Sequence, residues 1–420
     1  MRSILKRKSD LTLVHSLGIS LVSLGVPLGM YGNYLFPIVK WSPLFMALSL
    51  LLIISYKNLI NFKFPLFNKY FAIIIGFQAF MLFYGILSEN LTGQYLSFHL
   101  YIITLCISLS TLNTEMLKNY RQIILFIFYI SGALAVLGSY YMFKGLVVGE
   151  TAWEMKQGNA DYALEPFTVA GVSVSNLLAL LCIKFDKYKK INIILAVLFL
   201  TFDFYLLFSS TKRTPIFVCI ICFLTWSYMK GYIHPHNVYF AIKWFVILLF
   251  VSVFTYITIP WLKDSVDNFA TNFYYGVLNL FGNTEVMDKT GSAMARVESR
   301  EWAYNFIDNY FTLPNYIFGA GYMTRWLDNP ILQSYLDMGV LGFIGYFYLI
   351  VIFPSYFIIR KFTKSNIYIW ATLLCIYNIV SIINSGNPYI FGKYTSLCIL
   401  AFVIGLLRKN NINRLKNVPY

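Results

Sequence analysis

Residues 122–143 read QIILFIFYISGALAVLGSYYMF and carry no charge, with Arg121 before them and Lys144 after them. An α-helix needs about 20 predominantly apolar residues to cross the hydrocarbon core of a bilayer. This run meets that length, and a basic residue bounds it on either side. We therefore expect a membrane-spanning helix here, and similar runs recur along the chain.

The overall composition points the same way. Of the 420 residues, 58% are hydrophobic and 12% are charged, whereas an ordinary soluble domain is about 45–50% apolar and about 25% charged. The chain is too apolar to be a soluble, disordered or secreted disulfide-rich protein. Its net charge of +15 does not indicate nucleic-acid binding, because the basic residues are spread between apolar runs. The alternating pattern of a β-barrel is absent as well.

Twelve apolar runs predict an all-α, polytopic membrane protein in which residues 1–420 form one integral membrane domain. The first run follows a basic stretch like that of a signal peptide. No clear small-residue cleavage site follows it, so we interpret it as a retained anchor. The twelve runs are 11–31, 36–56, 70–88, 94–112, 122–143, 168–183, 191–208, 215–230, 243–260, 333–359, 366–384 and 393–407.

The distribution of Lys and Arg predicts the orientation of the chain. With the termini and the even-numbered connections on one side, that side holds 22 of the 33 basic residues. The positive-inside rule places this side, and both termini, in the cytoplasm. Of the 18 acids, 13 fall on the outer side. That side also carries a large hydrophilic loop, 261–332, and a smaller one, 144–167, so we expect the polar chemistry there.

A short outer connection, SSTKRT at 209–214, breaks the positive-inside pattern. Lys212 and Arg213 stand side by side before Pro215, a residue that favours the first turn of a helix. Free N–H groups at a helix N-terminus favour anions. Two cations at such a terminus indicate an anion site, unless both side chains reach out to lipid phosphates.

The large outer loop ends in a predicted helix that begins near Arg296. Ala303, Phe306, Ile307 and Tyr310 fall at helical spacing, and we expect them to pack this helix against the protein. Apolar side chains on one face leave the opposite face to polar groups.

Two arginines of this helix form a second candidate anion site. Arg296 and Arg300 are four residues apart and share one helix face, and guanidinium groups can bind a phosphate with two parallel hydrogen bonds. The alternative is that Glu298 and Glu301 neutralise them in ordinary surface ion pairs.

A glycine pair and a polar stretch follow. The sequence GAG at 319–321 permits a tight turn or a close backbone approach. Arg325, Trp326, Asp328 and Asn329 then precede a membrane run. An aromatic beside polar groups suits a sugar, but it is equally typical of the aromatic belt at a membrane interface. Asp328 also suits a helix cap before Asn-Pro.

Two acids lie inside predicted spans. An ionisable residue within a membrane is costly and is a functional hypothesis by default, and this applies to both Asp203 and Asp337. Each could instead pair with a Lys, Arg or Asn. The run that contains Asp337 also carries Gly339, Gly342 and Gly345, a pattern typical of close helix packing.

Cysteine and histidine give no metal-site pattern. The cysteines all lie in apolar runs, and we interpret the C-x-x-C of Cys219 and Cys222 as packing. No histidine falls in the large outer loop, so no ligand cluster with metal spacing is present in the sequence. The residues concerned are Cys106, Cys182, Cys219, Cys222, Cys375, Cys398, His15, His99, His234 and His236.

Taken in order, three motifs resemble those of the bacterial O-antigen polymerase (Wzy) and O-antigen ligase (WaaL) superfamily. The first is SSTKRT at 209–214, and the second is REW at 300–302 followed by IFGAG at 317–321. The third is DNPILQSYLDMGVLG at 328–342. The first 200 residues are similar only in hydropathy.

The resemblance implies a GT-C-like glycosyltransferase of the bacterial inner membrane, active on the periplasmic face. Its donor and acceptor would be glycans on undecaprenyl diphosphate, with no metal, cofactor or nucleic acid and with a chain-length regulator as a further partner. Arg213 and Arg300 would bind the diphosphate leaving group, and Arg300 would also assist catalysis. Arg296 is a rival for Arg300, and Lys212 and Arg325 would add to the anion site.

The resemblance also bears on the catalytic base. The ligases carry a His before the Asn of the last motif, where this chain has Asp328. The difference favours a polymerase and makes Asp328 the candidate base, with Asp337 and Glu298 as rivals. A carboxylate needs burial to become an effective base.

Other functions fit the same chain. A ligase would transfer finished polysaccharide to lipid A-core with the same fold. A lipid-linked glycan transporter would fit twelve spans, although the halves show no repeat and the largest polar segment is extramembranous. A non-catalytic subunit is a further alternative, against which the outer arginines argue.

Overall fold

The computed structural model describes residues 2–36, 40–113, 121–148, 166–185, 188–210, 213–232, 292–361, 363–382 and 386–416, with isolated positions between 257 and 278. Within these ranges all regular secondary structure is helical. The helices are α1 (Arg2–Leu35), α2 (Trp41–Ile53), α3 (Tyr56–Ile60), α4 (Lys69–Leu87), α5 (Gly93–Ser110), α6 (Arg121–Val148), α8 (Pro166–Cys182), α9 (Lys189–Ser209), α10 (Arg213–Lys230), α13 (Ser292–Tyr310), α14 (Leu313–Phe318), α15 (Pro330–Phe347), the π-helix η2 (Tyr348–Ile352), α16 (Phe353–Arg360), α17 (Asn366–Ser381) and α18 (Phe391–Lys416).

The helices have the lengths and composition of a polytopic membrane protein, as expected. Within the described ranges, six are long and apolar enough to cross a membrane: Leu13–Leu35, Lys69–Leu87, Arg121–Gly145, Lys189–Ser209, Pro330–Arg360 and Phe391–Lys409. Shorter apolar helices lie at Trp41–Ile53, Thr168–Cys182, Thr214–Lys230 and Asn366–Val380. The expected run 243–260 falls outside the described residues apart from two positions, as do residues 149–165 of the smaller outer loop.

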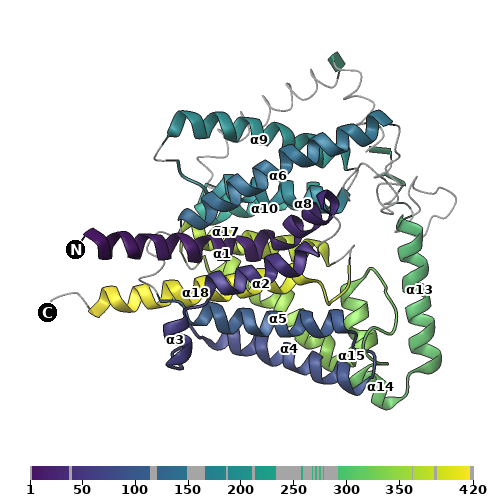
Figure 1. Cartoon of the computed structure of the whole chain (residues 1–420). Coiled ribbons are helices and arrows are strands. Elements are labelled where there is room, and N and C mark those ends of the chain that lie inside the picture. Colours follow the sequence, from purple (N-terminus) through teal and green to yellow (C-terminus); the bar gives the residue numbers. More distant parts are fainter. Residues whose placement is uncertain are drawn as a thin grey trace.

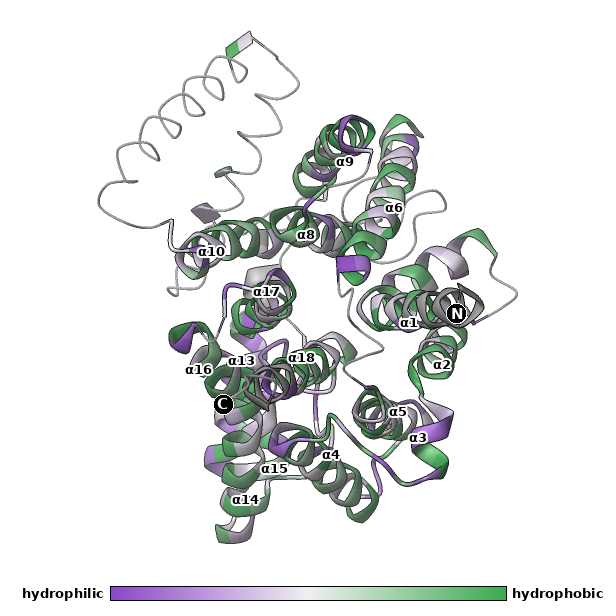
Figure 2. Ribbon diagram, turned by 90° about the vertical axis from the view of Figure 1, so that its left-hand side faces the viewer, coloured by the Kyte–Doolittle hydropathy of each residue, from purple (hydrophilic) through white to green (hydrophobic). Residues whose placement is uncertain are grey.

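The long helices run side by side, and the chain begins and ends at the same end of the bundle (Figure 1). At the opposite end, α13 lies across the bundle instead of along it (Figure 1). Seen end on, α17 and α18 occupy the middle (Figure 2). Their large side chains are accordingly buried, among them Trp370, Leu400 and Phe402. The bundle is therefore built around its C-terminal helices.

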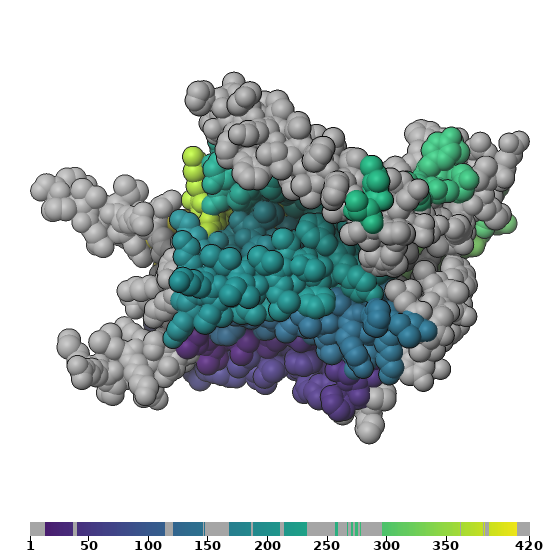
Figure 3. All heavy atoms as spheres, turned by 90° about the horizontal axis from the view of Figure 1, so that it is seen from above, coloured from purple at the N-terminus to yellow at the C-terminus, as the bar shows by residue number. Residues whose placement is uncertain are grey.

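Peripheral helices show why the bundle is stable in an apolar solvent. On α9, Ile194, Val197 and Phe204 are exposed, whereas Leu206 and Asp203 are buried. The teal segment of the chain, which includes α9, lies on the face seen from above in Figure 3. Lipid tails solvate such an apolar surface, so only the polar group needs a protein partner.

That partner is an amide on the neighbouring helix. Asn176 of α8 donates a hydrogen bond of 2.7 Å from Nδ2 to Oδ2 of Asp203. The pairing of Asp203 with an Asn was one of the alternatives drawn from the sequence.

A break in α15 shapes the end of the bundle at which α13 lies. Gly339 has φ +62° and ψ −158°, which interrupts the helix, so nearby carbonyls lose their helical donors. The GAG segment supplies replacements, since the Ala320 N–H donates to the Leu336 carbonyl at 2.8 Å. The Gly321 N–H donates to the Asp337 carbonyl at 3.2 Å. Irregular backbone at membrane depth is tolerated where protein groups satisfy it in this way.

Glycine is required on both sides of this contact. A Cβ added to Gly319 would lie 2.2 Å from the Asp337 carbonyl oxygen, and one added to Gly339 would lie 2.4 Å from the Ile317 carbonyl carbon. The close-packing role predicted for the glycines of α15 holds at Gly345, where a Cβ would lie 2.5 Å from a ring carbon of Phe77 in α4. At Gly342 the nearest atoms belong to Met338 of the same helix.

The helix α13 packs on the first half of α15 and on the loop before it. Ala303 and Ile307 are buried in a cluster with Leu327 and Leu336, as the helical spacing predicted. The prediction for Tyr310 was wrong, because this residue is 71% exposed. Tyr310 is the last residue of α13 and its ring stacks on Phe306 at 5.1 Å between centroids, while Trp302 and Phe306 pack against the cluster.

Candidate functional site

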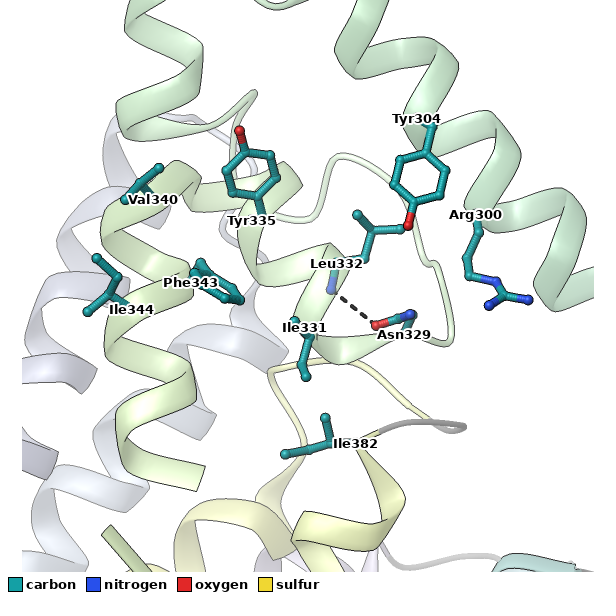
Figure 4. Close-up of a pocket in the computed structure, with 10 residues that line it drawn as sticks. All are labelled: Arg300, Tyr304, Asn329, Ile331, Leu332, Tyr335, Val340, Phe343, Ile344 and Ile382. Carbon is teal, nitrogen blue, oxygen red and sulfur yellow. Dashed lines mark hydrogen bonds between the residues drawn. The ribbon is translucent and has the colours of Figure 1, made fainter. Parts of the chain in front are cut away.

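A cavity of about 720 Å³ opens between α13, α15 and the end of α17 (Figure 4). Its volume is in the range of ligand-binding pockets, about 300–1,000 Å³. Polar groups lie at one end and an apolar wall extends along α15. The lining residues are Arg300, Tyr304, Asn329, Ile331, Leu332, Tyr335, Val340, Phe343, Ile344 and Ile382.

Arg300 brings a positive charge to this cavity from α13 (Figure 4). Tyr304 lies one turn further on the same helix face and lines the cavity as well. Among the described residues no side chain forms an ion pair or hydrogen bond with Arg300. The predicted neutralisation of Arg300 by Glu298 or Glu301 is therefore not seen, and its guanidinium can accept an anion.

Arg296 shares the face of Arg300, because both lie in α13 four residues apart. It is partly buried and has an interaction partner of its own. Glu298 is exposed on the same helix and does not line the cavity. The structure thus brings Arg300, but neither Arg296 nor Glu298, to the cavity wall.

Asn329 closes the polar end of the cavity. Its Oδ1 accepts a hydrogen bond of 3.1 Å from the Leu332 N–H and caps α15. The suggested capping role of Asp328 was therefore wrong, because the cap falls one residue later, directly before Pro330.

Asp328 instead ties two loops together. Its Oδ1 accepts hydrogen bonds from Trp326 Nε1 at 2.8 Å and from the Gly386 N–H at 3.3 Å. Its backbone is left-handed, with φ +50°, a conformation that Asp and Asn adopt more readily than most residues. Asp328 is partly buried and adjoins the cavity-lining Asn329 without being part of the lining itself.

Arg325, which the resemblance adds to the anion site, contacts an aromatic ring of α13. Its guanidinium carbon lies 4.3 Å from the centroid of the Trp302 ring, within the range of a cation–π contact. This contact joins the loop 319–329 to α13. Arg325 is exposed and does not line the cavity, and its place at the anion stays a prediction.

Asp337 lies behind the site and is fully buried. Its Oδ1 accepts from the Thr324 N–H at 3.0 Å, and its Oδ2 accepts from Gln333 Nε2 at 3.3 Å and Tyr389 Oη at 2.9 Å. Burial and the neighbouring carboxylate raise the pKa of Tyr389 well above its ordinary value of 10, so the phenol stays a donor. These contacts fix the loop, and Asp337 does not line the cavity.

A buried chain of polar groups also holds this loop. His99 of α5 contacts Tyr322 Oη through Nε2 at 2.8 Å and Gln78 Oε1 through Nδ1 at 2.8 Å. Gln78 Oε1 can only accept, so the hydrogen of the neutral imidazole lies on Nδ1, and Nε2 accepts from the Tyr322 hydroxyl. Sequence reasoning missed this network, since His99 and Tyr322 are 223 positions apart.

The remaining predicted residues can be placed briefly. Lys212 lies outside the described residues, and Arg213 is described only as the first residue of α10. The six cysteines are free, and Cys219 and Cys222 pack within α10. In the described part of the chain, no three or more His, Cys, Asp or Glu side chains form a group suitable for a metal ion.

Two of the three sequence motifs meet in space. IFGAG contacts the LDMG segment through the Gly319–Gly339 approach, and Arg300 of REW faces Asn329 of DNP across the cavity. Comparison with protein-family models, with curated proteins and with solved structures finds no match.

Proposed function

We propose that this protein is a membrane glycosyltransferase that polymerises lipid-linked oligosaccharide repeat units, as an O-antigen polymerase does. Its substrates would be repeat units on undecaprenyl diphosphate. The observation that carries the proposal is a cavity with an apolar wall, lined also by the Arg300 guanidinium, which has no hydrogen-bond or ion-pair partner among the described residues.

The two ends of the cavity match the two parts of such a substrate. Arg300 offers a planar fork of donors to a diphosphate, which a point charge would not reproduce. Val340, Phe343 and Ile344 offer an apolar surface along α15 to a prenyl chain, and Ile344 is 57% exposed. A soluble sugar nucleotide has no long apolar chain that could be buried against this wall.

The reaction proposed is displacement at the anomeric carbon. The acceptor hydroxyl forms the new glycosidic bond while the bond to the diphosphate breaks, and the diphosphate keeps the electron pair. Arg300 stabilises the negative charge that develops on the leaving group. Arg213, Lys212 and Arg296 are further candidates for this anion site.

The hydroxyl proton needs a base, and we assign this role to Asp328. Its Oδ1 is held by two N–H donors, which orient the carboxylate. In the described part of the chain Oδ2 accepts no hydrogen bond. Asp337 is less suited, because three donors already occupy its oxygens away from the cavity.

We further propose a GT-C-like arrangement of twelve spans with both termini in the cytoplasm and residues 261–332 in the periplasm. The meeting of the chain ends at one end of the bundle, with α13 at the other (Figure 1), supports an even number of spans. The excess of Lys and Arg in the termini and even-numbered connections supports the orientation.

The test is reconstitution of the purified protein with a lipid-linked repeat unit. A ladder of products differing by one repeat is expected. Transfer of finished polysaccharide to lipid A-core alone would identify a ligase, and movement of the lipid without new bonds would identify a transporter. Either of these results would overturn the proposal.

A further inference from the structure

At the end of the bundle where the chain begins and ends, two cations contact one tyrosine ring, and a third is the next residue in the chain after one of them. Lys69 Nζ lies 5.3 Å and Arg408 Cζ 5.6 Å from the centroid of the Tyr70 ring. Next to Arg408, Lys409 Nζ donates to the Pro65 carbonyl at 3.4 Å. We call Lys69, Arg408 and Lys409 the basic cluster.

The backbone beneath the basic cluster is fixed. Asn68 caps α4 by accepting from the Tyr70 N–H at 3.0 Å, and its Nδ2 donates to the Ala401 carbonyl of α18 at 3.0 Å. Gly405 allows α18 to approach the segment before α4 closely, because a Cβ at this position would lie 2.8 Å from the Leu66 carbonyl oxygen. The helices α4 and α18 therefore hold the backbone that carries the three cations in fixed relative positions.

Tyr70 itself is anchored. It is buried and its ring stacks on Phe353 of α16 at 4.8 Å between centroids. Lys69 and Arg408 thus lie close to a rigidly held tyrosine ring. Their common position beside this ring defines where an anion would bind.

No acid of these segments balances the charge. The sequence contains no Asp or Glu after Asp337, and Glu89 is the one acid between Leu11 and Asn113. Glu89 follows the far end of α4. Like charges brought within about 10 Å repel one another, so an external anion would reduce the repulsion among Lys69, Arg408 and Lys409.

The chain just before the basic cluster exposes large apolar side chains, which we call the apolar rim. Ile60, the last residue of the short helix α3, is 75% exposed, and Phe62 (85%) and Phe67 (48%) lie between α3 and α4, with α3 at the edge of the bundle (Figure 1). Lys57 and Lys63 are exposed among them. A small soluble anion would leave this rim in water, whereas an amphiphile would cover it.

We propose that the basic cluster binds the headgroup phosphate of an anionic phospholipid, with the lipid tails against Phe62 and Phe67. Basic groups between membrane helices are a recognised chemistry for anionic lipid headgroups. The binding needs no part of the outer cavity and does not depend on the glycosyltransferase proposal.

The test is lipid retention by the full-length protein in native mass spectrometry, after incubation with phosphatidylglycerol or phosphatidylcholine. The variant Lys69→Gln/Arg408→Gln/Lys409→Gln removes the basic cluster. Since Lys and Arg near an anionic membrane surface each contribute about a fivefold gain in binding, we expect the triple variant to lose phosphatidylglycerol by about 100-fold. Arg408→Gln alone should lose about fivefold.

The matched control is Lys184→Gln/Lys189→Gln/Lys190→Gln, which removes the same charge at the ends of α8 and α9. We expect it to retain phosphatidylglycerol like the unmodified chain. Equal loss in the control, or no loss in the cluster variant, would overturn the proposal.

A second pair of measurements separates a lipid from a soluble anion. Phe62→Ser/Phe67→Ser should weaken phosphatidylglycerol binding while leaving all the cations in place. Inorganic pyrophosphate at the same concentration should not displace the lipid. If pyrophosphate displaces it, or if the serine variant binds it unchanged, the site is one for soluble anions and the lipid assignment fails.

Discussion

The contact between the GAG loop and the broken helix α15 can be tested by a single methyl group. In Gly319→Ala the added Cβ would lie 2.2 Å from the Asp337 carbonyl oxygen, about 1 Å inside a close C···O contact of about 3.3 Å. The loop and α15 must then separate by about that distance.

Two effects set the expected loss. Separation breaks the hydrogen bonds from Ala320 to Leu336 and from Gly321 to Asp337, each worth about 1 kcal/mol. Position 319 has φ +83° and ψ −175°, a conformation essentially confined to glycine that costs a residue with a Cβ about 1–3 kcal/mol. We therefore expect Gly319→Ala to lower the free energy of unfolding by about 3–5 kcal/mol.

Denaturant unfolding in mixed micelles measures this loss, and Gly76→Ala in α4 is the matched control. A Cβ on Gly76 would meet no atom within 4 Å, so this variant should be unchanged or up to about 1 kcal/mol more stable. A displacement of about 1 Å at a reacting centre can also cost about 100-fold in rate, so product ladders should shorten in Gly319→Ala. Equal stability of the two variants would refute the backbone contact.

Three further predictions concern the site and the topology. Arg300→Ala should reduce the rate of polymerisation by about 10²–10³-fold. Arg300→Lys should also be inactive, because lysine lacks the planar fork of donors. If either variant makes product of normal length at a normal protein level, the diphosphate binds elsewhere. Asp328→Asn preserves an acceptor for Trp326 and Gly386, so the protein should unfold like the unmodified chain yet lose activity, whereas full activity would remove Asp328 as the base. In cells with a permeabilised outer membrane, a cysteine at Thr290 should react with a membrane-impermeant thiol reagent, and Lys187→Cys should not. The reverse labelling pattern would show that the proposed orientation of the chain in the membrane is inverted.

The sequence predicted the positions of helices well, because apolar length and flanking charge are local properties. The run 122–143 falls within α6, and 191–208 falls within α9. The break at Gly339 could not be predicted in this way. Residues 333–359 read as one continuous apolar run, and the break is visible only once the loop amides of Ala320 and Gly321 supply the missing donors.

Side-chain roles were harder to predict than helices. Arg325 and Asp328 have the residue types of an active site, but their partners, Trp302 and Gly386, are 23 and 58 positions away. The partner of a polar side chain is set by tertiary packing. A pattern of neighbouring residues in the sequence carries no information about such distant contacts. The His99–Tyr322 hydrogen bond is the clearest case, since neither residue lies in a motif that predicts the other.

The hydrogen-bond and cation–π partners of the charged groups around the cavity indicate which of these groups is available to a substrate. Arg325 is stacked on Trp302, and the carboxylate of Asp337 accepts three hydrogen bonds. A group already satisfied by the protein gains little from a ligand, because binding would exchange one set of contacts for another. Arg300 has no such partner among the described residues and faces a cavity with an apolar wall. The desolvation of a guanidinium at such a wall is best offset by an anion joined to an apolar chain, which is the chemistry of a prenyl diphosphate.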